Sequence, residues 1–111
     1  MTTTTVLARN YRLGRAYQAE GWYAYIKDGA YTNEERNALV DALIRAQVKA
    51  FNRLLPKGCY WNPRLGEIHG PATASLDGID LDLVLAMAAD AVAERFEKIE
   101  TKVLRRLSCT R

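Results

Sequence analysis

The chain has few of the residues that small metal-binding and disulfide-rich proteins depend on. Its 111 residues include one histidine, two cysteines and three prolines. So few imidazoles and thiols exclude a zinc-finger framework and most disulfide scaffolds. A chain of this size can form a core without covalent staples. We therefore expect Cys59 and Cys109 to be free thiols, and we expect no metal and no cofactor.

Long hydrophobic runs are also missing. No stretch approaches the roughly 18 uninterrupted apolar residues of a transmembrane helix. The opening Met-Thr-Thr-Thr-Thr-Val-Leu lacks the basic-then-apolar order of a secretory signal. We therefore expect a cytoplasmic protein that does not enter a membrane. The length suits a single domain, 1–111, with frayed ends at 1–5 and 108–111, where the Thr run is either frayed or an edge strand.

Recognisable catalytic signatures are absent as well. The sequence contains no glycine-rich phosphate loop, no nucleophile elbow and no His-Glu-x-x-His helix. Cys59 and His69 could face each other across a hairpin, but they lack an orienting partner and oxyanion donors. The acids Asp77, Asp80 and Asp82 gather at a helix start, where capping explains them better than Mg²⁺ or Ca²⁺ binding. We predict a protein that is not an enzyme, without catalytic or metal-binding residues.

What the chain does contain is an uneven distribution of charge around a net value of +3. Residues 78–97 carry five acids against one arginine, and residues 98–111 carry five cations against one acid. Residues 1–27 are basic too, so positive charge is concentrated at the two ends. This pattern can attract phosphate, and it suits a solvated surface equally well.

Residues 33–55 have the clearest signs of an amphipathic helix. Thr32 followed by Glu35 matches the capping box, in which each side chain accepts from an exposed amide at the helix start. Apolar residues then recur at three- and four-residue steps as far as Leu55. Pro56 ends the pattern because proline has no backbone N–H to donate.

A second amphipathic helix is predicted over 80–107, with Asp77 or Asp80 as its cap. At this length it would span about 40 Å. A compact domain of this size has a radius of gyration of about 13 Å. We therefore expect the helix to overhang its domain, to bend, or to be covered by another chain, and the last possibility points to a homo-oligomer.

The segment between these helices favours a small β-hairpin. Residues 59–61 and 65–69 have the composition of strands, and Asn62-Pro63 is a turn signal between them. The N-terminal third is ambiguous. We predict a helix over 8–20 and an extended aromatic segment over 22–26, since Gly21 weakens a helix and aromatic residues favour strands.

These elements predict an α+β fold that is mostly helical. Two long helices at 33–55 and 80–107 are joined by the hairpin, and the aromatic N-terminal segment packs on them. Aromatic residues form two blocks, which are either core or a partner-binding surface, because Trp and Tyr are frequent at interaction hot spots. The candidates for such a surface are Trp22, Tyr23, Tyr25, Tyr60 and Trp61.

Basic residues offer an alternative binding surface. They recur about every four residues on both predicted helices, which places each set on one helix face. Such faces could contact the phosphates of a nucleic acid, although no helix-turn-helix, zinc-finger or RNA-recognition signature supports that interpretation. The candidates are Arg45, Lys49, Arg53, Lys98, Lys102, Arg105 and Arg106.

The stretch from Leu54 to Pro63, the sequence Gly-Glu-Ile-His-Gly at 66–70 and the sequence Leu-Asp-Gly at 76–78 before the last helix resemble small uncharacterised proteins of actinobacterial bacteriophages. The resemblance spans about residues 30–105 and brings no catalytic residues with it. It implies a small phage product in the host cytoplasm that binds a host or phage protein. A non-catalytic protein–protein interaction module is therefore the expected function, and nucleic-acid binding is the alternative.

Overall fold

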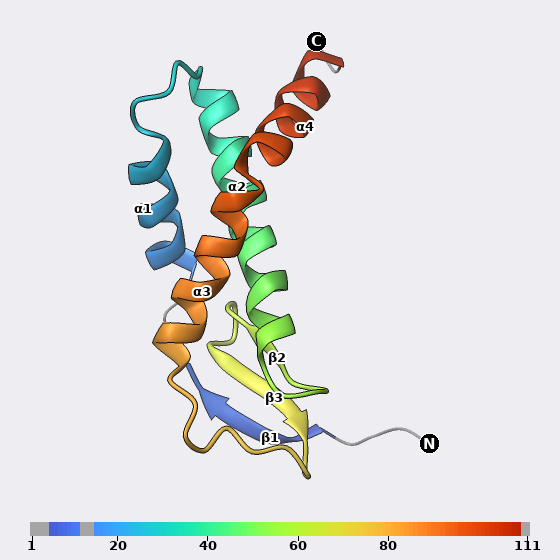
Figure 1. Cartoon of the computed structure of the whole chain (residues 1–111). Helices are drawn as coiled ribbons and strands as arrows, with labels where there is room; N and C mark the ends of the chain where they lie inside the picture. The colour runs from blue at the N-terminus through green and yellow to red at the C-terminus, as the bar shows by residue number, and fades with distance from the viewer. Residues whose placement is uncertain (1–4, 12–14, 110–111) are drawn as a thin grey trace.

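The computed structural model describes residues 5–11 and 15–109, which form three strands and four helices (Figure 1). In chain order they are β1 (Thr5–Asn10), α1 (Arg15–Ile26), α2 (Asn33–Leu54), β2 (Tyr60–Asn62), β3 (Glu67–Pro71), α3 (Leu81–Glu94) and α4 (Phe96–Cys109). The mostly helical α+β fold that the sequence predicts is confirmed.

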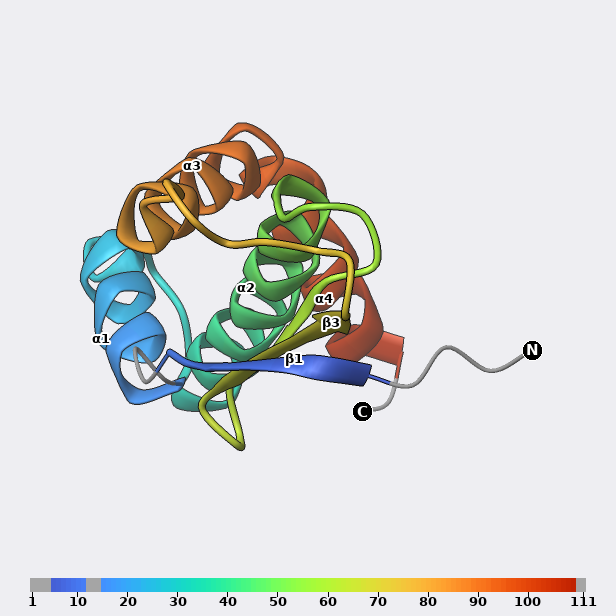
Figure 2. The ribbon, with the colours of Figure 1, turned by 90° about the horizontal axis from the view of Figure 1, so that it is seen from below.

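The molecule is elongated, with the sheet at one end and the helices rising from it (Figure 1). Its principal extents are 47 × 29 × 22 Å and its radius of gyration is 15.8 Å. Viewed from the sheet end, α1, α3 and α4 are arranged around α2 (Figure 2). The central position of α2 explains why it packs against each of the other three helices.

The helix predicted over 33–55 is present as α2, from Asn33 to Leu54. The predicted capping box is confirmed, since Glu35 N–H donates to the Thr32 hydroxyl and Thr32 N–H donates to the Glu35 carboxylate. The buried residues of α2 recur at helical spacing along one face, which local sequence alone indicates.

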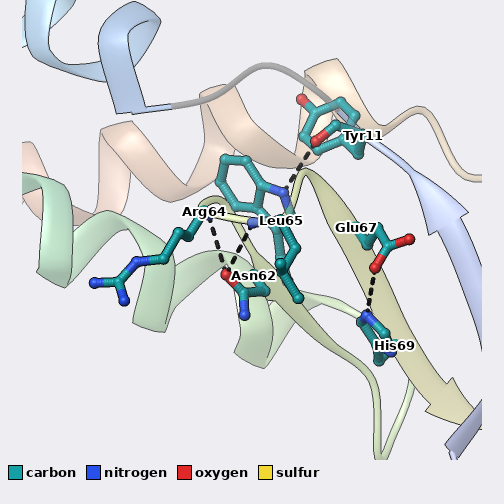
Figure 3. Close-up of polar contacts among 7 residues, drawn as sticks. Tyr11, Asn62, Arg64, Leu65, Glu67 and His69 are labelled. Atoms are coloured by element: carbon teal, nitrogen blue, oxygen red, sulfur yellow. Dashed lines mark hydrogen bonds and ion pairs between the residues drawn. The ribbon is translucent and has the colours of Figure 1, made fainter.

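The predicted hairpin is present as β2 and β3, with Tyr60 opposite His69. Its turn is held by the Asn62 side-chain oxygen, which accepts from the N–H groups of Arg64 and Leu65 (Figure 3). A third strand, β1, pairs antiparallel with β3 and gives the order β1-β3-β2. Thr5 therefore begins an edge strand, while residues 1–4 lie outside the described part of the chain.

The N-terminal predictions are wrong in two places. Residues 8–10 belong to β1 rather than to a helix, and residues 22–26 are the last turns of α1 rather than an extended segment. The physical reason is burial. Gln18, Trp22 and Ile26 are four residues apart, so a helix places all three on one face, and all three are buried. Packing of that face overrides both the cost of Gly21 and the strand preference of aromatic residues.

The long helix predicted over 80–107 is two helices that meet at Arg95. The chain makes a tight turn there, in which Arg95 N–H donates to the carbonyl of Val92. No proline or glycine marks the break. Of the three outcomes expected for an overlong helix, bending is the one observed, and it directs α4 along the upper half of α2 (Figure 1). Asp80 caps α3, as one of the two predicted capping residues.

The buried apolar residues form two clusters along α2. The lower one joins the sheet to α2 and α3 around Phe51 and Trp61, and the upper one joins α1, α2 and α4 around Leu43 and Trp22. Between them lies the amide of Gln47, which accepts from Trp22 Nε1 at 2.8 Å and donates to the carbonyl of Leu85 at 3.2 Å. One buried polar side chain therefore ties three helices together.

Two tyrosines donate hydrogen bonds to carboxylates across the fold. Tyr11 donates to Asp82 Oδ1 at 3.1 Å, and Tyr31 donates to Glu100. Burial, and next the hydrogen bond to Glu100, raise the pKa of Tyr31 to about 12. Burial, and next the hydrogen bond to Asp82, raise the pKa of Tyr11 well above its usual value.

This arrangement predicts a loss of stability in alkali. Both phenols stay protonated in the folded chain at a pH where the unfolded chain ionises them, so their stabilising effect is complete below about pH 10 and declines from about pH 10 to 12. Urea midpoints measured across this range should fall for the parent protein. Tyr31→Phe should fall less steeply, and an equal slope in both proteins would contradict the assignment.

Candidate functional site

Residues from both predicted basic stripes lie on opposite walls of one groove. The groove runs between α2 on one side and the α3–α4 turn and α4 on the other, with a volume of about 480 Å³. Its floor consists of small and branched apolar residues. Its basic residues are Arg45, Lys49, Arg53, Arg95, Lys102 and Arg106, and the rest of the lining is Ala42, Ala46, Ala50, Ala91, Val92, Ile99 and Val103.

The charged side chains that line this groove all have the same sign. None of the described residues that line it is acidic. Arg45 forms an ion pair with Asp41 at 3.2 Å, one turn away on the same helix. In residues 5–11 and 15–109, Lys49, Arg53 and Lys102 have no ion pair. Because low-polarity walls and like charges concentrate a field, the groove is an attractive position for a polyanion.

The structure sorts the seven basic candidates into two sets. Five of them line the groove, whereas Lys98 and Arg105 do not. Sequence reasoning also missed Arg95, which lines the groove at the turn between α3 and α4. Its spacing of three residues from Lys98 and seven from Lys102 places it on the same face of a continuous helix, so the sequence did carry a signal for this residue.

Two of the five aromatic candidates are structural. Trp61 is 2% exposed and Trp22 is 5% exposed, so both indoles belong to the core. They therefore present almost no surface to a partner, which corrects the interface interpretation for these two residues. Their indole N–H groups are satisfied inside the protein, by the carbonyl of Tyr11 and by Gln47.

The three tyrosine candidates are exposed and lie apart. Tyr23 donates to Asn37 at 2.6 Å, Tyr60 stacks on the imidazole of His69, and Tyr25 contacts the ring of Trp22. Tyr60 is on β2 at the sheet end, while Tyr23 and Tyr25 are on α1. The structure therefore does not gather the aromatic blocks into one surface.

The residues considered for catalysis and metal binding are buried in the core or hydrogen-bonded to neighbouring residues. Cys59 is buried and free, and burial raises the pKa of its thiol, which disfavours a nucleophilic thiolate at neutral pH. His69 Nε2 lies 3.0 Å from the Glu67 carboxylate instead (Figure 3). Within the described ranges, no three His, Cys, Asp or Glu side chains are placed to hold a metal ion.

Over the described residues, none of the helices combines the length and the apolarity that crossing a bilayer requires. Comparisons of the chain with protein-family models, with curated proteins and with solved structures found no match.

Proposed function

We propose that the protein binds nucleic acid through the groove between α2 and α4. The observation that carries this proposal is the convergence of five cationic side chains from α2 and α4, and of Arg95 from the turn before α4, on one groove whose lining includes no acid among the described residues. Lys and Arg contacts to phosphates supply most of the affinity of non-specific nucleic-acid binding, because each contact releases condensed counterions. Cations on both walls suit a sugar-phosphate strand lying between them.

The lining also indicates what is recognised. Among the described residues it contains no aromatic ring on which a base could stack and no amide, hydroxyl or carboxylate, so the only side chains that could reach a base edge are the cations that also contact phosphates. Contacts to phosphates position a nucleic acid but carry no sequence information. Binding is therefore expected to depend on the backbone and to show little preference for sequence.

Fluorescence anisotropy with labelled oligonucleotides, single-stranded and duplex, tests the proposal. Affinity should fall steeply from about 50 to 200 mM salt. Replacing one cation on each wall, Lys49→Gln with Lys102→Gln, should weaken binding and flatten the slope of log K against log salt. The expected change is about 1.8 for duplex DNA or about 1.4 for a single strand.

Lys98→Gln with Arg105→Gln is the matched control. It removes the same amount of charge from two exposed positions on α4 that lie outside the groove. This pair should leave the slope nearly unchanged. Equal losses in the two pairs would mean that general positive charge, and not the groove, attracts the oligonucleotide. Binding of an acidic helical peptide in preference to every oligonucleotide would replace the proposal with a protein partner.

A further inference from the structure

A second groove lies between α1 and α3. Its charge is negative, whereas that of the groove between α2 and α4 is positive. Its volume is about 710 Å³, and α3 contributes residues to both grooves. Most of its lining is apolar and much of that is alanine. Among the residues that the structure describes, the charged ones in its lining are Glu20, Asp82 and Asp90. A ligand for this groove must therefore combine apolar surface with positive charge.

An unpartnered hydrogen-bond acceptor is built into the same groove. Gln18 lines it and is 3% exposed, and within residues 5–11 and 15–109 its Oε1 has no hydrogen-bond partner. Buried polar oxygens are nearly always paired, and leaving one unpaired costs about 1–3 kcal/mol. A ligand that brings an N–H donor to this position would remove that cost.

The orientation of the Gln18 amide follows from its neighbours. The indole of Trp22 can only donate and the carbonyl of Leu85 can only accept, so Gln47 must present Oε1 to the indole and Nε2 to the carbonyl. Gln47 Oε1 then also accepts from Gln18 Nε2 at 3.2 Å. Because Gln18 Nε2 is directed at Gln47, Gln18 Oε1 is the atom that points away from this network.

The walls of the groove suit a flat cation. Tyr17 is 60% exposed and Tyr25 is 54% exposed, and both line it. A guanidinium group stacks on aromatic faces, and its five N–H donors can serve a carboxylate and an amide oxygen at the same time. The apolar stem of an arginine would cover the alanines on α3.

We propose that the groove between α1 and α3 is a docking site for an arginine side chain presented by a partner protein. The guanidinium donates to Gln18 Oε1 and pairs with the acidic rim, while its stem packs on α3 between the two tyrosines. This site is separate from the proposed nucleic-acid site, so either can fail without the other.

Nuclear magnetic resonance with Nα-acetyl-arginine amide as the probe tests the site directly. The indole N–H of Trp22 and the side-chain amide of Gln18 should shift and saturate, with dissociation in the millimolar range expected for a single side chain. Trp61 lies in the other cluster and provides an internal reference that should not move. Nα-acetyl-citrulline amide keeps the shape but lacks the charge, and it should give no saturable shift.

Variants of the rim make the test specific. Glu20 and Asp90 are exposed, so Glu20→Gln with Asp90→Asn should fold normally and weaken the arginine probe on the order of fivefold. Glu97→Gln with Asp77→Asn removes the same charge elsewhere and should bind the probe as the parent does. Equal binding of citrulline, or equal loss in both variants, would overturn the proposal. A Trp22 shift on dilution of the protein alone would also overturn it, by making a second copy the occupant.

Discussion

Replacing Trp61 by alanine is expected to lower the free energy of unfolding by about 3–5 kcal/mol, which is a large part of the total for a domain of this size. The indole is 2% exposed and lies at the centre of the lower cluster. Its ring centroid is 4.9 Å from that of Phe51 and 5.2 Å from that of Tyr11. Alanine would leave a cavity beneath the sheet that these neighbours can only partly fill.

The indole of Trp61 also forms a hydrogen bond to Tyr11, the residue that follows β1. Trp61 Nε1 donates to the carbonyl of Tyr11 at 3.2 Å, and the backbone N–H of Trp61 donates to the side-chain oxygen of Asn52 at 2.8 Å. Trp61→Phe keeps a ring in the cluster and loses only the bond to Tyr11, so it should cost much less than the alanine variant. Urea denaturation followed by circular dichroism measures both.

A native and stable Trp61→Ala protein would contradict this account. Such a result would support the partner-binding role that the sequence first suggested for Trp61. Aromatic residues at interaction hot spots contribute to binding and need not stabilise the free protein. The structure favours unfolding, since the ring has no exposed face with which to reach a partner.

The elements that sequence predicted well are those specified by neighbours along the chain. The capping box at Thr32, the apolar spacing that follows and Pro56 together specify α2 to within a residue. The hairpin is equally local, because Asn62 both closes the turn and marks it. In each case the residues that make the structure are within a few positions of the residues that indicate it.

The elements that sequence missed depend on distant contacts. Strand β1 is stable because it pairs with β3, some sixty residues later, and no local pattern indicates that pairing. Helix α1 is predicted as far as residue 20, but it continues to Ile26 against local preferences because Trp22 and Ile26 pack on α2. The break at Arg95 has no proline or glycine to mark it, and Phe96 beyond it contacts Tyr25 of α1 with ring centroids 5.4 Å apart.

The candidate site divides in the same way. The recurrence of Lys49 and Arg53 on one helix face, and of Lys102 and Arg106 on another, follows from helical periodicity alone. Their position on two walls of one groove follows from the bend at Arg95, which the sequence does not show. The unpaired oxygen of Gln18 is harder still to predict from sequence. It depends on the orientation of the Gln47 amide, which the contacts with Trp22 and Leu85 determine.

Replacing Gln47 by leucine is expected to lower the free energy of unfolding by about 3 kcal/mol or more. Leucine fits a buried helical position by volume, so the cost comes from hydrogen bonds and not from packing. The change leaves the indole N–H of Trp22, the amide of Gln18 and the carbonyl of Leu85 without the partner they share. Each unpaired buried group costs about 1–3 kcal/mol.

Gln18→Leu is the matched control, with the same substitution at a position that is also buried. It removes one donor together with the acceptor that has no partner, while Gln47 keeps its bonds to Trp22 and Leu85. Because a lost bond and a removed desolvation cost oppose each other, we expect a change within about 1 kcal/mol. Equal urea midpoints for the two variants would contradict the asymmetry of the network. The expected difference between them would show that Gln47, and not Gln18, is the side chain that joins the three helices.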